Sequence, residues 1–332
     1  MVCLTFTVRR SKHKVPWCSP NPTDIPTTVG FFSPWLTCIT DDARAFVLNW
    51  LQAPDPSRDL ESLSGARLDG TGIWLIKSEQ FQKWERLPLA LWLHGKPGSG
   101  KSVLSSLVVE HLGDLCSSHK DWGYAYYYFS NILHRENQSV NGCLTATIKQ
   151  LIRNKSVRVP ENLTALCRES RQPTRKDLSK ALSELIKSST RTYLVLDALD
   201  ECFERDALLT EVQKIIPTEE NGLSVHIILT SRLENDIEAS LDRCTDKMSL
   251  QTASVDADIQ YYTSQVLETD RKIKPWPDDL KSLIKSTLIE KADGTYVSFN
   301  ITRIMWTSLT FTDFAGLRFR STICANVIPS AM

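Results

Sequence analysis

The sequence lacks an excess of charge of either sign, because its 332 residues include 39 lysines and arginines and 39 aspartates and glutamates. A chain without a basic surplus gives no electrostatic reason to expect nucleic acid or an anionic membrane as a partner. It also lacks an apolar run as long as a membrane helix, and its N-terminus lacks the apolar centre and cleavage site of a signal peptide. We therefore expect no nucleic-acid partner, no membrane partner and a cytoplasmic location.

Paired cysteine motifs are absent as well. The nine cysteines are scattered along the chain, and no two of them form a C-x-x-C pair. An odd, dispersed set in a chain of this size indicates reduced thiols, and it argues against a disulfide framework or a structural zinc site. What the sequence does contain, 42% apolar and 23% charged residues, is the composition of an ordinary globular protein.

Composition and periodicity divide the chain into successive segments. Residues 1–40 are interrupted by prolines and are predicted to be an irregular tail. Residues 41–86 have the pattern of a helical lead-in, 87–250 that of an α/β core, and 251–294 that of the start of a helical subdomain. Residues 295–332 form a tail whose pattern diverges from what precedes it.

A glycine-rich turn between an apolar run and an amphipathic segment gives the clearest functional signal. It fits the pattern G-x-x-x-x-G-K-[ST] in full, through Gly95, Lys96, Pro97, Gly98, Ser99, Gly100, Lys101 and Ser102, with Val103 next. Glycines allow backbone N–H groups to turn inward around an anion, and the following helix adds the positive end of its dipole. In such loops the lysine reaches the β- and γ-phosphates and the serine hydroxyl binds Mg²⁺. The alternative, a chance turn before a helix, is disfavoured by the strand and helix around it.

A second candidate follows the apolar run at 192–196, which ends in Asp197. An apolar run that ends in a carboxylate predicts a buried parallel strand with the acid at its carboxyl end. There Asp197 would bind Mg²⁺, and either Asp200 or Glu201 would polarise an attacking water. A surface acidic turn is the alternative, and the nearby phosphate loop makes it the weaker one.

Residues 224–229 predict another buried strand, and Arg232 follows at the same edge of the sheet. A guanidinium at that place can sense or stabilise a γ-phosphate. A purely structural salt bridge is the alternative for this arginine. The residues predicted to carry catalysis are therefore Asp200, Glu201 and Arg232.

Other segments complete the expected fold. Helices are predicted over 79–85, 140–152 and 178–186, and a strand rich in tyrosine over 122–129. Residues 156–176 are charged and are expected to be irregular. We interpret Trp74, Phe81 and Trp84 as core side chains, and a secondary interpretation places residues 70–74 over the nucleotide base. The fold class expected is an α/β P-loop NTPase sandwich of three layers, with a mostly parallel sheet and a short helical extension.

These motifs together resemble the NACHT domain of the STAND class of P-loop NTPases. The resemblance rests on residues 95–102, the acidic box 197–201 and the strand end 229–232, and it extends over about 41–294. More narrowly, the chain is similar to the nephrocystin-like NTPase region of filamentous fungi, which usually precedes ankyrin or WD repeats. The Gly70–Trp74 segment, Ile237, Asp258–Ile259 and Lys291–Gly294 also match that pattern.

The resemblance implies a signalling switch. An ADP-bound, closed monomer would exchange its nucleotide for ATP, open and form a homo-oligomer, and slow Mg²⁺-dependent hydrolysis would reset it. Transferred by position, residues 95–102 hold the phosphates and Mg²⁺, Asp197 is the Mg²⁺ carboxylate, Asp200 and Glu201 activate water, and Arg232 senses the γ-phosphate. The family normally continues beyond Gly294 as a helix, a winged helix and repeats, a pattern that residues 295–332 do not follow.

The absence of two motifs argues against two competing functions, a Ras-like GTPase and a small-molecule kinase. The N-K-x-D motif of Ras-like GTPases is missing, although the choice between ATP and GTP stays open, and no arginine-rich lid supports a small-molecule kinase. A nucleotide-holding scaffold without turnover remains as the alternative to a switch with weak ATPase activity.

Overall fold

The computed structural model describes residues 43–129, 138–154, 156–242, 245–251, 253–271 and 274–292. All of them belong to the unit that spans Asp42–Met332. The two tails predicted at 1–40 and 295–332 lie outside the described residues, as does the end of the predicted helical subdomain at 293–294.

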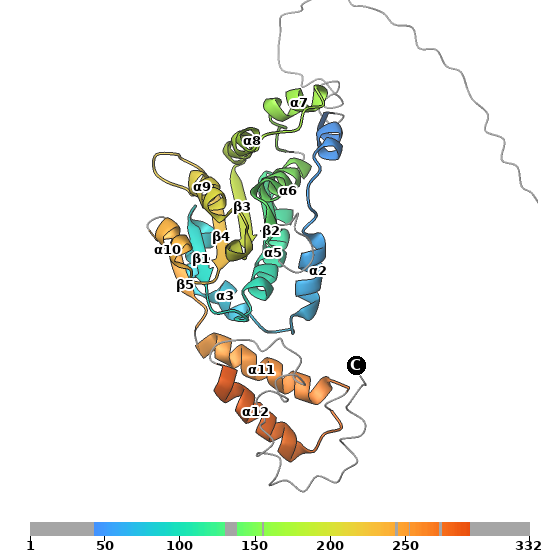
Figure 1. Ribbon diagram of the computed structural model, residues 1–332, viewed down its shortest axis with the longest axis vertical. Coiled ribbons are helices and arrows are strands. Elements are labelled where there is room, and N and C mark those ends of the chain that lie inside the picture. Colours follow the sequence, from blue (N-terminus) through green and yellow to red (C-terminus); the bar gives the residue numbers. More distant parts are fainter. Residues whose placement is uncertain are drawn as a thin grey trace, which may run out of the picture. The chain divides into compact units, whose positions relative to one another are not determined.

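A five-stranded sheet forms the centre of the described region (Figure 1). Its strands are β1 (Ala90–His94), β2 (Trp122–Tyr128), β3 (Arg191–Asp197), β4 (Val225–Ser231) and β5 (Asp246–Ser249). The strand order is β2-β3-β4-β1-β5, and each of these pairs is parallel. The expected α/β fold is confirmed, with a sheet that is parallel throughout the strands described.

The strand order sets the position of the predicted site. Strand β4 lies between β1, which leads into the phosphate loop, and β3, which ends in Asp197. In register, His94 pairs with Ser231, and Leu196 pairs with Leu229. Because all three strands are parallel, their carboxyl ends meet at one edge of the sheet, where ligands bind in open α/β folds.

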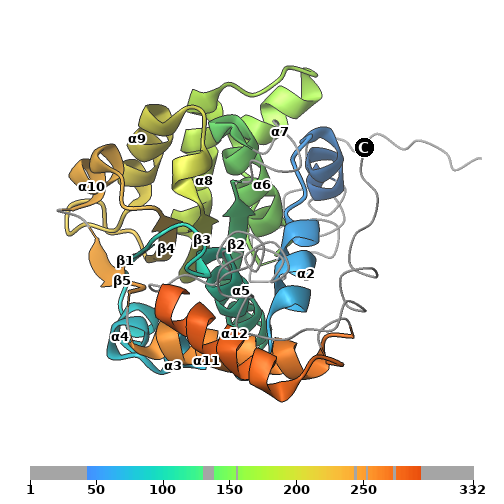
Figure 2. The same cartoon turned by 60° about the horizontal axis from the view of Figure 1, so that its bottom comes forward.

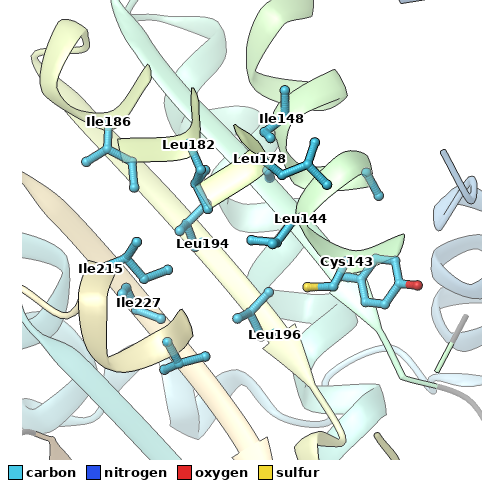
Figure 3. Close-up of a cluster of buried hydrophobic side chains, with 14 of the residues drawn as sticks. Cys143, Leu144, Ile148, Leu178, Leu182, Ile186, Leu194, Leu196, Ile215 and Ile227 are labelled. Carbon is cyan, nitrogen blue, oxygen red and sulfur yellow. The ribbon is translucent and has the colours of Figure 1, made fainter. Parts of the chain in front are cut away.

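Helices cover both faces of the sheet, which makes the three layers expected. Side chains alternate between the faces, so Ala90 and Trp92 belong to one buried cluster and Leu91 and Leu93 to the other. The first cluster includes a helix over residues 43–50 and the helices α6 (Val140–Arg153), α7 (Glu161–Arg168), α8 (Arg175–Ser188), α9 (Arg205–Ile215) and α10 (Asn235–Leu241). Figure 3 shows part of this cluster, where side chains of α6, α8 and α9 meet Leu194, Leu196 and Ile227 of the sheet.

The second face of the sheet carries another set of helices. They are α3 (Ile73–Lys77), α4 (Glu79–Arg86), α5 (Lys101–Ser117) and the first part of α11 (Ala253–Thr269), and α2 (Ser57–Ala66) packs beside α5. Phe81 and Trp84 are fully buried in this cluster, as predicted, and Trp74 is partly buried against it.

The helical extension pairs α11 with α12 (Asp278–Ala292) (Figure 2). Leu267, Leu280 and Ile284 form a small cluster of their own between these helices. Among the helices in the described part of the chain, none is both long and apolar enough to cross a membrane.

Most of the predicted elements are confirmed, and one prediction is wrong. Residues 161–168 form helix α7 within the stretch 156–176 that was expected to be irregular. Pro160 precedes the first turn, and Leu163 and Cys167, four positions apart, are buried against the core. A helix of two turns with only two buried positions is too short to show a clear period in a charged stretch.

The outer edge of the sheet is covered by side chains of α6. Gln150 donates from Nε2 to the carbonyl oxygen of Tyr126 at 2.8 Å and accepts from the Tyr126 N–H at 3.2 Å. One turn later, Asn154 donates from Nδ2 to the carbonyl oxygen of Trp122 at 2.8 Å. Strand β2 is the edge strand, so these amides occupy backbone groups that no further strand pairs in the described sheet.

Candidate nucleotide site

The phosphate loop joins the end of β1 to the start of α5. Gly98 and Gly100 have φ values of +76° and +81°, a region that side chains disfavour. Gly95 is required for a different reason: a Cβ there would lie 2.8 Å from Ser99 Oγ and 3.2 Å from Leu250 Cβ. The glycines of the motif are therefore needed for the shape of the loop itself.

Lys101 begins helix α5 and points back into the loop. Its Nζ donates to the carbonyl oxygens of Gly95 at 2.9 Å and Lys96 at 2.8 Å, and it lies 3.4 Å from Ser99 Oγ. Burial lowers the pKa of this ammonium, and the carboxylates of Asp200 and Asp197 oppose that shift. The positive charge is thus held inside the curve of the loop by neutral acceptors.

Asp197 is the buried anion beneath the loop. Its Oδ2 accepts from Ser102 Oγ at 2.6 Å, and its Oδ1 accepts from Ser105 Oγ at 2.6 Å and Thr230 Oγ1 at 2.7 Å. Burial raises the pKa of the Asp197 carboxyl, while the hydroxyl donors and Lys101 act in the opposite direction. The predicted Mg²⁺ pair, Ser102 and Asp197, is therefore in direct contact.

Three residues around Asp197 were given no role in the sequence analysis: Ser105, Thr230 and Ala198. The Ala198 N–H donates to Thr230 Oγ1 at 2.9 Å, so the Thr230 hydroxyl proton is directed to Asp197. Ala198 has φ +58°, which places it in the left-handed region. Ser105 follows Ser102 by three positions on α5 and so shares its helix face, a signal that was present in the sequence.

Asp200 and Arg232 form an ion pair across the ends of β3 and β4. Arg232 Nε lies 3.1 Å from Asp200 Oδ2, and the Arg232 backbone N–H donates to Asp200 Oδ1 at 3.0 Å. Arg205 also donates to the Asp200 carbonyl oxygen at 2.8 Å. The salt bridge considered as the alternative for Arg232 is present, and it lies at the predicted site.

A cavity of about 280 Å³ lies over these groups, close to the lower end of the range for small-molecule sites. The predicted residues that line it are Pro97, Gly98, Ser99, Gly100, Lys101, Ser102, Val103, Asp200, Glu201 and Arg232. Gly95, Lys96 and Asp197 are not among its lining residues. The first two hold the Lys101 ammonium, and Asp197 lies behind Ser102.

The donor set fits Mg²⁺ as a nucleotide brings it. No group of three or more His, Cys, Asp or Glu residues able to hold a metal occurs among the residues described. Mg²⁺ is commonly held by one or two carboxylates together with phosphates and waters, without a full protein cage. A buried carboxylate in contact with a serine hydroxyl, at the foot of an anion-binding loop, suits that mode.

The far end of the cavity is formed by the lead-in segment and by α11. Arg67, Leu68, Thr71, Gly72 and Tyr262 line it there. Arg67 is ion-paired with Glu110 of α5, and Thr71 Oγ1 donates to the Leu68 carbonyl oxygen at 2.8 Å. The suggestion that residues 70–74 lie over the nucleotide base stays a prediction, now with Thr71 and Gly72 in the cavity wall.

A parallel sheet with a phosphate loop after β1 and an acid at the end of β3, with β4 between the two strands, defines the class of P-loop NTPases. Residues 70–232 match the family model described as "Nephrocystin 3, N-terminal". The chain is 24% identical over 274 residues to the vegetative incompatibility protein HET-E-1 of Podospora anserina, with 74% of this chain aligned. These matches support the assignment of the chain as a NACHT-like P-loop NTPase.

The relatives are longer than the part this chain matches. The alignment with HET-E-1 spans 19% of that protein. Among solved structures, Cdc6p of Pyrobaculum aerophilum is 16% identical with a TM-score of 0.40, and covers 70% of this chain and 55% of its own. The ORC2 protein of Aeropyrum pernix is 14% identical with a TM-score of 0.39, and covers 75% and 62%.

Proposed function

We propose that the chain binds a nucleoside triphosphate, with ATP the expected nucleotide, and acts as a NACHT-type signalling switch with slow Mg²⁺-dependent hydrolysis. One observation carries the proposal: Asp197 at the end of β3 accepts a 2.6 Å hydrogen bond from Ser102 at the end of the phosphate loop. That contact joins residues 95 positions apart in the chain. The two groups expected to share a metal ion thus meet beside the lysine expected to bind phosphate.

Each part of the loop has a role in this proposal. The backbone N–H groups between Gly95 and Ser102 would surround the phosphates, and Lys101 would exchange its carbonyl acceptors for phosphate oxygens. Ser102 and Asp197 would hold Mg²⁺, Asp197 directly or through water. The bound ion supplies positive charge that neutralises the phosphates during transfer.

For hydrolysis we favour Glu201 over Asp200 as the residue that orients water. Both carboxylate oxygens of Asp200 face Arg232, one toward its guanidinium and one toward its backbone N–H. Glu201 also lines the cavity and belongs to the same short helix, Leu199–Glu201. Arg232 would reach a γ-phosphate by leaving Asp200, which makes the ion pair the element that responds to the nucleotide.

The same ion pair supports a second candidate, a scaffold that holds nucleotide without turnover. While Arg232 and Asp200 are paired, the guanidinium and the carboxylate are bound to each other. A homo-oligomer in the triphosphate state, the choice between ATP and GTP, and a cytoplasmic location belong to the proposal as expectations from the family.

The deciding experiment measures nucleotide content and single-turnover hydrolysis of ATP and GTP by the purified chain, with and without Mg²⁺. We expect Glu201→Gln to keep nucleotide affinity and to lower the hydrolysis rate by about 100-fold, the size of a typical general-base contribution. The exposed Glu219→Gln makes the same chemical change outside the cavity and should hydrolyse at the wild-type rate.

The outcomes separate the candidates. Bound nucleotide with slow, Mg²⁺-dependent turnover, and a larger particle in a non-hydrolysable ATP analogue than in ADP, supports the switch. Bound nucleotide with no turnover and no change in particle size supports the scaffold. A chain that binds neither ATP nor GTP contradicts both.

A further inference from the structure

Asp258 of helix α11 accepts two hydrogen bonds from the lead-in segment. Its Oδ2 accepts from the Gly72 backbone N–H at 2.7 Å and from the Trp74 indole Nε1 at 2.8 Å. The contact joins residues 186 positions apart in the chain.

The face of α11 that carries Asp258 also carries a wall of the nucleotide cavity. Tyr262 follows Asp258 by one helical turn and lines the cavity together with Thr71 and Gly72. Val255 and Ile259, on the same side of α11, are buried in the cluster between the sheet and α5. Helix α11 is therefore packed against the core by the same face that reaches the cavity.

Gly72 is in contact with the helix that follows the phosphate loop. It has φ +77°, and a Cβ there would lie 2.8 Å from Leu104 Cδ2 and 3.0 Å from Leu107 Cδ2, both on α5. Its N–H group is bound by Asp258, and the residue itself lines the cavity. The segment at Gly72 thus lies between α5 on one side and α11 on the other.

We propose that Asp258 is a positioning residue that couples the docking of helix α11 to the binding of nucleotide. By holding Gly72 and Trp74, Asp258 fixes the segment that closes the far end of the cavity and places Tyr262 beside it. Nucleotide that contacts this end then stabilises the docked α11, and by reciprocity the docked α11 raises nucleotide affinity. The inference rests on the proposed function, and it assigns to the helical extension a defined route of response to the nucleotide.

Four variants of the full chain test this coupling. Asp258→Ala removes the acceptor, and Asp258→Asn keeps an oxygen that can still accept both hydrogen bonds. Trp74→Phe keeps an aromatic ring and removes one donor, so it remains informative if Asp258→Ala fails to fold. Asp256→Ala removes the same charge at an exposed position of the same helix and serves as the control.

The measurements are affinity for a fluorescent ADP analogue with Mg²⁺, and amide hydrogen exchange with and without that analogue. We expect Asp258→Ala to weaken binding by about tenfold, Trp74→Phe by about threefold, and Asp258→Asn and Asp256→Ala by less than twofold, within the usual range of coupling between sites. In the wild type, the analogue should slow exchange in residues 95–105, in 66–77 and in α11. In Asp258→Ala, only the slowing at 95–105 should remain.

A purely structural role makes a different prediction. If Asp258→Ala lowers the melting temperature but leaves affinity and the exchange pattern with nucleotide unchanged, the coupling is overturned. If the wild type binds no nucleotide, the proposed function fails and the coupling fails with it. Even then, the hydrogen bonds of Asp258 can be tested without nucleotide. Backbone amides of residues 70–77 should exchange hydrogen faster in Asp258→Ala than in Asp256→Ala.

Discussion

The two ends of the nucleotide cavity are built in different ways. At the phosphate end, the loop from Gly95 to Ser102 is shaped by its own glycines and held by its own Lys101. At the far end, the segment from Arg67 to Gly72 is held by Glu110 and Asp258, which come from two other helices. The first end is therefore specified by a short stretch of chain, and the second by the tertiary structure.

This difference indicates a division of roles in the proposed switch. Backbone amides and an ammonium bind a phosphate chain irrespective of the base it carries. An end that depends on docked helices can change when those helices move, so it is suited to reporting which nucleotide is bound. Variants that alter only one end of the cavity would show whether nucleotide affinity can change separately from the docking of the helices.

The largest effect is expected from the phosphate end. Lys101→Ala should weaken nucleotide binding by about 100-fold, because it removes a charge-assisted contact to phosphate from a partly buried site. The exposed Lys120→Ala is the control for loss of one positive charge. Titration with a fluorescent nucleotide measures the effect, and wild-type affinity in Lys101→Ala would contradict the site.

A substitution that crowds the far end of the cavity should reduce nucleotide affinity less than Lys101→Ala does. Gly72→Ala places a Cβ against Leu104 and Leu107 at φ +77°, and we expect nucleotide affinity to fall by about tenfold, the range of a typical coupling between sites. Gly70→Ala is the matched control, because Gly70 also has a positive φ, +90°, but nothing lies within 4 Å of the added Cβ.

Comparison of the two glycine variants separates strain from contact. Gly70→Ala should lower the free energy of unfolding by about 1–2 kcal/mol through backbone strain alone and leave affinity within threefold of the wild type. Equal losses of affinity in both variants would show that the contact with α5 has no role at the far end.

The smallest expected effect is that of Asp197→Asn on the melting temperature of the chain without nucleotide or Mg²⁺. Burial raises the pKa of this carboxyl in the folded chain, so the folded state binds its proton more readily than the unfolded state does. Its contribution to stability is therefore most favourable below the unfolded pKa and is lost as the pH rises from there through the folded pKa. Asp197→Asn does not titrate, and at neutral pH without Mg²⁺ it should melt about 2–4 °C above the wild type.

The pH dependence and the ligand provide the checks on this prediction. The difference in melting temperature should shrink as the pH is lowered toward the usual carboxyl pKa, and calorimetry across that range measures it. With Mg²⁺ and nucleotide the order should reverse, because only the wild type keeps the carboxylate that would hold the ion. A variant that is stabilised by Mg²⁺ and nucleotide as strongly as the wild type would contradict the metal role of Asp197.

The predictable part of this molecule is the part encoded locally. The apolar runs before His94, Asp197 and Thr230 were sufficient to place three strands, and parallel pairing then brought their ends together. Asp200 and Arg232 were predicted as site residues, but their pairing depends on how two strand ends approach each other. Individual motifs identify such residues without specifying which of them are in contact.

The remaining part depends on distances that a single sequence does not specify. Thr230 binds Asp197 because β4 lies beside β3, and an internal threonine in an apolar strand gives little sign of that. The contact between Asp258 and Gly72 requires α11 to be packed on the second face of the sheet. Helix α7 was missed for a related reason. Its two buried residues, Leu163 and Cys167, are identified as core residues only by the tertiary packing around them.

The amides of Gln150 and Asn154 on the rim of β2 have a consequence for how copies of this chain can associate. A bare strand at the rim of a sheet is a template on which another chain can add itself through main-chain pairing. In this chain, backbone groups of β2 are already hydrogen-bonded to the side chains of Gln150 and Asn154. Copies at high local concentration are therefore hindered from adding a strand at the β2 edge, and an ordered assembly would have to use other surfaces of the chain.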